Sequence, residues 1–148
     1  MHELLLAVHV AAGAIGLVAG PVAGVARKAR GPHTVAGWTY QACCAALCLS
    51  ALGLVAMSPT LWPFALIAVP TQLAAVGAVV VRRRERRGWR PLHVQLALSS
   101  YVSFVTAFVV QAAGGFWWLV PVALGSTVVS VVTARVAAAG TRPATAAA

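Results

Sequence analysis

The positive charges of this chain are confined to three of the segments that separate its long apolar runs. The segments after the second and fourth runs, around Ser58 and Gly114, carry no charge. A chain that crosses a membrane five times would therefore present every cation on one face, which is the asymmetry that orients membrane proteins. The eleven cations are Arg27, Lys28, Arg30, Arg82, Arg83, Arg84, Arg86, Arg87, Arg90, Arg135 and Arg142.

The apolar runs themselves have the length of transmembrane helices, since about 20 apolar residues cross the hydrocarbon core. The sequence predicts an all-α polytopic bundle of five transmembrane helices in one domain, residues 1–135, in a bacterial inner membrane. Because cationic segments face the cytoplasm, we predict the N-terminus outside and the C-terminus inside. Residues 136–148 are small and weakly polar, and we expect a disordered cytoplasmic tail there. The predicted helices are Leu4–Ala26, Val35–Met57, Leu61–Val81, Leu92–Ala112 and Phe116–Ala134.

Composition excludes several classes of protein. Only 9% of the residues are charged, against roughly 25% in soluble domains, and the mean hydropathy is +0.89. The net charge of +9 is divided among short clusters, so we expect anionic lipid headgroups as partners and no nucleic acid. The only acids, Glu3 and Glu85, lie outside the runs, which argues against an ion-coupled transporter.

Membrane lipids are the main partners that this charge pattern predicts. A lipophilic small molecule and a homo- or hetero-oligomer are further candidates. The headgroup contacts are predicted at Arg82, Arg83, Arg84, Arg86 and Arg87.

One face of the first predicted helix combines a histidine with small residues. Glycines at this spacing let helix backbones approach closely in lipid, so we expect this face to pack against protein. His9 is either an interior histidine bonded to a neighbouring hydroxyl or carbonyl, or a ligand or proton-handling residue, because ionisable groups inside a bilayer are costly. The face consists of His9, Gly13, Gly16, Gly20 and Gly24, at helical spacing.

Two other histidines begin helices at the opposite membrane surface. His33 follows Pro32 and His93 follows Pro91 closely, each just after a basic segment. About 30 Å of hydrocarbon core separates this level from His9, so a metal shared by two histidines would use His33 and His93.

These two histidines also share a polar environment in the sequence pattern. We expect both imidazoles to converge on a shared cavity near Tyr40 and Ser100. The helix that His93 begins continues with a polar flank, which we expect to face protein. That flank is Gln95, Ser99, Ser103 and Thr106.

Three classes of function remain open. The first is a redox component in which His33 and His93 ligate the metal of a b-type haem or contact a quinone headgroup. The second is an intramembrane enzyme for a lipophilic small molecule, with His9 or His93 as acid or base. Tyr40 or Tyr101 would support that proton transfer. The third is a non-catalytic accessory or assembly subunit, whose polar residues serve packing.

Short motifs follow one another along the chain in a characteristic order. They are His9-x3-Gly13, Gly20-Pro21, His33-x3-Gly37-x2-Tyr40 and His93-x6-Ser100-Tyr101, with basic segments between them. This order resembles a family of small bacterial membrane proteins catalogued as domain of unknown function 2306, although Leu96 stands where that family has methionine. The resemblance covers most of the chain and implies a compact helical membrane bundle with three characteristic histidines. It implies no activity.

A reporter that is active only in the cytoplasm tests the predicted orientation. Fused after Arg142, it should be active, because the cationic segments hold that end inside. Inserted in the uncharged segment 58–61, it should be inactive. The reverse pattern would contradict the orientation.

Overall fold

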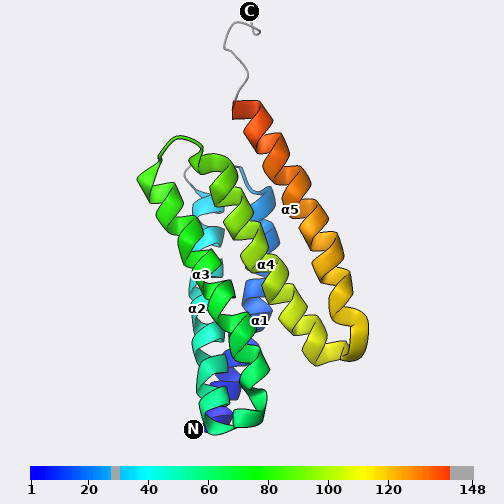
Figure 1. Cartoon of the computed structure of the whole chain (residues 1–148). Coiled ribbons are helices and arrows are strands. Elements are labelled where there is room, and N and C mark those ends of the chain that lie inside the picture. Colours follow the sequence, from blue (N-terminus) through cyan, green and yellow to red (C-terminus); the bar gives the residue numbers. More distant parts are fainter. Residues whose placement is uncertain (28–30, 141–148) are drawn as a thin grey trace, which may run out of the picture.

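Five long helices account for most of the chain in the computed structural model, which describes residues 1–27 and 31–140 (Figure 1). Each helix is long and apolar enough to cross a membrane, and no strand occurs in the described ranges. The predicted five-helix, all-α membrane architecture is therefore confirmed. The elements are α1 (His2–Val25), α2 (Pro32–Met57), the 3-10 turn η1 (Pro59–Leu61), α3 (Trp62–Arg84), α4 (Trp89–Ala113), the 3-10 turn η2 (Gly115–Trp118) and α5 (Leu119–Gly140).

The helix ends differ from the predicted ones by a few residues. α2 begins at Pro32, because proline lacks the N–H that the first helical position leaves unpaired. The expectation of a disordered tail from residue 136 is wrong for 136–140, where α5 continues to Gly140. The alanines of that stretch favour helix. The rest of the predicted tail, together with Lys28 and Arg30, lies outside the described residues.

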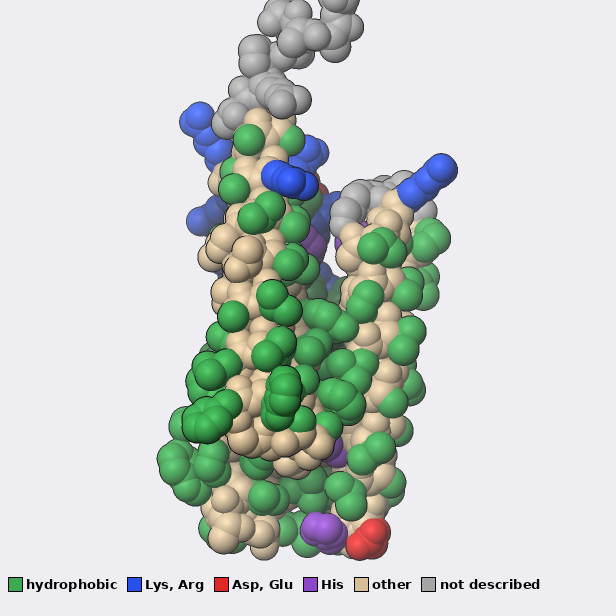
Figure 2. Space-filling view, turned by 90° about the vertical axis from the view of Figure 1, so that its right-hand side faces the viewer, with side chains coloured by type: hydrophobic (Ala, Val, Ile, Leu, Met, Phe, Trp, Pro, Cys, Tyr) green, Lys and Arg blue, Asp and Glu red, His purple; other side chains and the backbone are tan. Residues whose placement is uncertain are grey.

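Helices α1 to α4 form a bundle, and α5 leans on its outside (Figure 1). Each helix packs on the next one along the chain, and α1 also contacts α4, so α2 and α4 lie diagonally across the bundle. α5 packs mainly against α4 and buries none of its residues. Figure 2 shows the arginine side chains of the described residues gathered at one end of the molecule, called here the arginine end.

The bundle core is built from small residues around two aromatic rings. Tyr40 and Phe104 pack there with 5.9 Å between ring centroids, among buried alanines and cysteines. A side chain on Gly16 would place its Cβ 2.7 Å from the Phe104 ring, and one on Gly20 would overlap the Tyr101 ring. The predicted close packing of the glycine face is confirmed at these positions. At Gly24, by contrast, an added Cβ meets nothing within 4 Å.

Alanine at Gly20 and at Gly24 should have opposite effects on stability. Gly20→Ala should destabilise the protein by about 1–3 kcal/mol, because the added methyl group overpacks against Tyr101. Gly24→Ala should stabilise it by roughly 0.5–1 kcal/mol, since alanine loses less backbone entropy in a helix. Thermal unfolding in a mild detergent measures both, and equal midpoints would show that the glycine face is not tightly packed.

Candidate functional site

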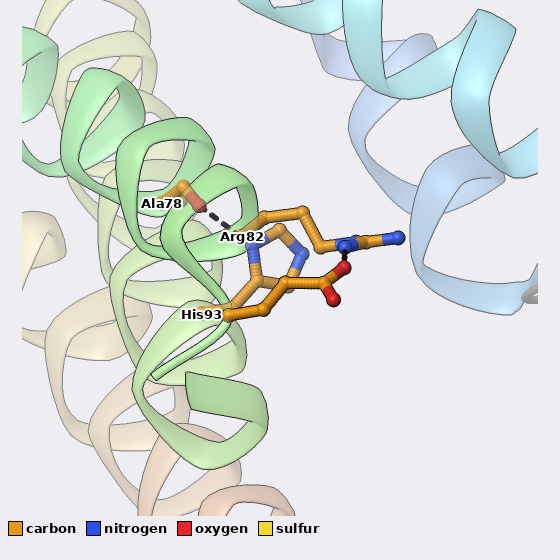
Figure 3. A network of polar contacts seen from close by, with 4 residues as sticks. Ala78, Arg82 and His93 are labelled. Atoms are coloured by element: carbon orange, nitrogen blue, oxygen red, sulfur yellow. Dashed lines mark hydrogen bonds and ion pairs between the residues drawn. The ribbon is translucent and has the colours of Figure 1, made fainter. Parts of the chain in front are cut away.

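The histidines that begin α2 and α4 each bond back to the helix that precedes them. Nδ1 of His33 lies 2.7 Å from the carbonyl oxygen of Ala23, and Nδ1 of His93 lies 2.9 Å from that of Ala78 (Figure 3). A carbonyl oxygen can only accept, so Nδ1 must carry the proton in both rings. In a neutral ring, Nε2 then keeps a lone pair that can accept a hydrogen bond or bind a metal.

The two carbonyls are available for different reasons. Ala23 lies in the last turn of α1, whose helix ends at Val25, so its oxygen has no helical N–H partner. Ala78 lies inside α3, and its oxygen accepts the imidazole proton through its second lone pair. In both cases the histidine ties together the two helices of one hairpin.

Tyr40 of α2 and Ser100 of α4 meet in the core between these diagonal helices. Their hydroxyl oxygens are 3.1 Å apart, and Ser100 has no exposed surface. Because the Ser100 hydroxyl donates to the carbonyl of Ala97, the proton of the shared bond comes from Tyr40. Tyr40 and Ser100 are therefore neighbours, and the expected convergence of the two imidazoles on a shared cavity beside them stays a prediction.

The two histidines stand at one level above this bond. His33 precedes Tyr40 by seven positions and His93 precedes Ser100 by seven, which is two helical turns along the same face. Seven residues correspond to about 10 Å along each helix, so the two rings begin at the same height towards the arginine end. That their Nε2 atoms face each other stays a prediction.

A cationic and aromatic rim surrounds His93. The Trp89 ring meets the His93 ring edge-on with 6.2 Å between centroids, and the guanidinium of Arg82 lies 4.8 Å from the Trp89 centroid. Arg82 also pairs with Glu85, and Figure 3 shows its side chain beside the imidazole. A second arginine, Arg90, lies 5.6 Å from the same tryptophan. Glu85 offsets the charge of Arg82, so the rim keeps an excess of positive charge through Arg90, which favours a ligand with negative charge.

His9 belongs to a separate level, within the α1–α2 interface. Its Nδ1 lies 3.2 Å from the hydroxyl of Ser50. Ser50 donates its own proton to the carbonyl of Leu47, so the histidine is the donor to Ser50. The interpretation of His9 as an interior histidine bonded to a neighbouring hydroxyl is confirmed.

Tyr101 has a partner that the sequence analysis missed. Its hydroxyl donates to the carbonyl oxygen of Leu17 over 3.0 Å. Pro21, four residues later in α1, has no N–H, so it deprives Leu17 of its helical donor. The proline was the signal: a proline within a helix frees the carbonyl four positions before it. In the described part of the chain, neither Tyr40 nor Tyr101 bonds to a histidine.

The polar flank of α4 faces protein only in part. Gln95 is exposed, and the expectation is wrong there because it lies near the arginine end, where α4 leaves the packed core. Ser99 and Ser103 are half-buried and Thr106 is buried.

No protein-family model, curated protein or solved structure matches this chain. The resemblance to the family of unknown function 2306 therefore stays a prediction.

Removing the Tyr101 hydroxyl should destabilise the bundle. Tyr101→Phe should cost about 1–3 kcal/mol, because the Leu17 carbonyl is left unpaired in the protein interior. In a Pro21→Ala background the cost should shrink, since alanine restores the helical N–H to Leu17. Unfolding free energies of the four proteins in detergent form a double-mutant cycle. An equal cost in both backgrounds would mean that the hydroxyl does not serve this carbonyl.

Proposed function

We propose that His33 and His93 bind a b-type haem near the arginine end, and that the protein is a redox component of the bacterial inner membrane. The observation that carries the proposal is their shared tautomer: each ring bonds a carbonyl through Nδ1, at 2.7 and 2.9 Å, and leaves Nε2 free of a proton. Haem iron accepts imidazole nitrogens as axial ligands. A hydrogen bond from the other ring nitrogen to a carbonyl is the usual companion of a metal-bound histidine.

The placement of the two residues supports the same proposal. They stand on the diagonal helices α2 and α4, at equal height above the Tyr40–Ser100 bond. Cofactors in helix bundles are held in this way, by side chains from facing helices. With the orientation set by the cations, the site would lie at the cytoplasmic leaflet.

A porphyrin would supply the metal ligands that the two histidines lack. Within residues 1–27 and 31–140, no three histidine, cysteine or carboxylate side chains form a metal site, so a metal held by this pair needs further ligands, which the porphyrin nitrogens supply. The guanidinium of Arg82 beside His93 would exchange its partner Glu85 for a carboxylate group of haem. The rings of Tyr40, Tyr101 and Phe104 pack together in the core two turns away, so the core beneath such a haem would be apolar.

A quinone suits these histidines less well. The carbonyl oxygens of an oxidised quinone only accept hydrogen bonds. A neutral histidine ring whose single N–H is Nδ1–H, already bonded to Ala23 or Ala78, has no proton at Nε2 to donate to the quinone. The tautomer therefore favours a metal centre.

A second candidate, the accessory subunit, is favoured by a different observation. His9, His33, His93 and Tyr101 each join two helices by a hydrogen bond, which is what packing alone would require. For packing alone, only the Nδ1–H of His33 and of His93 is needed. The two functions therefore differ in whether Nε2 is used.

An asparagine at position 33 or 93 separates these functions. The asparagine amide nitrogen is attached at the same point of the side chain as Nδ1, so it can still donate to the carbonyl, but nothing replaces Nε2. After expression with haem precursor and purification in mild detergent, the protein should show a Soret band. His33→Asn and His93→Asn should each abolish the band while the thermal stability of the haem-free protein stays close to that of the unsubstituted chain.

His9→Ala serves as the matched control and should keep the band, because His9 lies at the other level and bonds Ser50. An unsubstituted protein that is well folded and takes up no haem would refute the proposal and leave the accessory role. Retention of the band in either asparagine variant would show that the haem has other ligands.

A further inference from the structure

Two prolines interrupt the hydrogen bonding of the bundle helices, but only one of the carbonyls they free has a protein donor. Pro21 lies inside α1 and Pro70 inside α3, and each removes the N–H that would pair with the carbonyl four residues earlier. The Leu17 carbonyl receives the Tyr101 hydroxyl instead. No side chain of the described residues donates to the Leu66 carbonyl.

Leu66 and Pro70 form part of the wall of a cavity of about 400 Å³ between α3, α4 and α5. Val102 and Ser103 of α4 and Val122 of α5 complete much of the lining. The size is that of a small ligand pocket, roughly 300–1,000 Å³ in proteins. Ser103 is ten residues along α4 from His93, about 15 Å at the rise of a helix, so this cavity is distinct from the histidine site.

Some polar groups in the wall of the cavity have hydrogen-bond partners within the protein, and others have none. Thr106 donates to the Val102 carbonyl over 2.8 Å, and Thr71, next to the cavity, donates to the Ile67 carbonyl over 2.6 Å. The Ser103 hydroxyl has no partner among the residues that the structure describes. Two groups on residues of the wall therefore keep unused hydrogen-bonding capacity: the Leu66 carbonyl, which can accept, and the Ser103 hydroxyl, which can donate or accept.

We propose that this cavity binds a lipophilic alcohol, with an alkyl or prenyl chain, taken up from the bilayer. Its hydroxyl would donate to the Leu66 carbonyl, as Tyr101 does to Leu17, and accept from Ser103. An oxidised quinone or an ester has no proton for Leu66 and fits less well. The exposed Leu66 and Trp118, 65% and 42% accessible at the edge of the cavity, leave it open to lipid.

Farnesol, a prenyl alcohol, and the hydrocarbon farnesene, which lacks the hydroxyl, form a matched pair of probes. Binding of labelled farnesol is measured on the full chain in lipid nanodiscs, with empty nanodiscs as the blank. The protein should bind one farnesol saturably. Farnesene can make neither of the two hydrogen bonds, so it should bind roughly 25-fold more weakly, which is the product of two fivefold losses.

Two variants test the two polar contacts. Ser103→Ala removes the hydroxyl, and Pro70→Ala returns an N–H to the Leu66 carbonyl while favouring the helix, so each should weaken farnesol about fivefold or more and leave farnesene unchanged. Ser99→Ala, one turn away on α4 and outside the cavity lining, should leave both unchanged. Equal binding of the two probes, or farnesol binding that neither variant weakens, would overturn the proposal and reduce the cavity to a lipid-filled packing gap.

Discussion

The structure depends on satisfying backbone carbonyls where no water is available. Inside a bilayer every carbonyl that a helix leaves unpaired costs free energy, and this chain leaves such groups at the end of α1 and at its internal prolines. His33 fills the first of these positions and Tyr101 the second, at Leu17. The side chains that do so come from other helices, so the same bonds that satisfy the backbone also align the bundle.

This constraint also shapes the chemistry of His33 and His93. A bond to a carbonyl fixes which nitrogen carries the proton, and for His33 and His93 it is Nδ1. Both rings are then oriented and hold an unprotonated Nε2, without any acidic partner. The bond that fastens two helices therefore also leaves each ring suited to metal ligation. Packing and cofactor binding differ in whether Nε2 is used.

The helices could be predicted from the sequence because apolar length and charge placement decide them. The helix ends are predicted less accurately, because α5 continues to Gly140 through alanines for which the sequence predicts a disordered tail. For the site, helical spacing predicted that His33 and His93 lie at one level, two turns from Tyr40 and Ser100. Their carbonyl partners did not, since every residue carries a carbonyl and only the packing register selects Ala23 and Ala78. The prolines were visible, but which freed carbonyl would meet a hydroxyl depends on how α4 lies against α1.

The most direct measurement of this account is the protonation of the histidine rings in the folded, haem-free protein. Nitrogen-15 NMR of histidine-labelled protein in detergent distinguishes Nδ1–H from Nε2–H, and His33→Asn and His93→Asn assign the signals. We predict that the neutral rings of His33 and His93 both carry their proton on Nδ1 and leave Nε2 unprotonated. A proton on Nε2 in either ring would mean that the bond to Ala23 or Ala78 is absent, and would contradict the account.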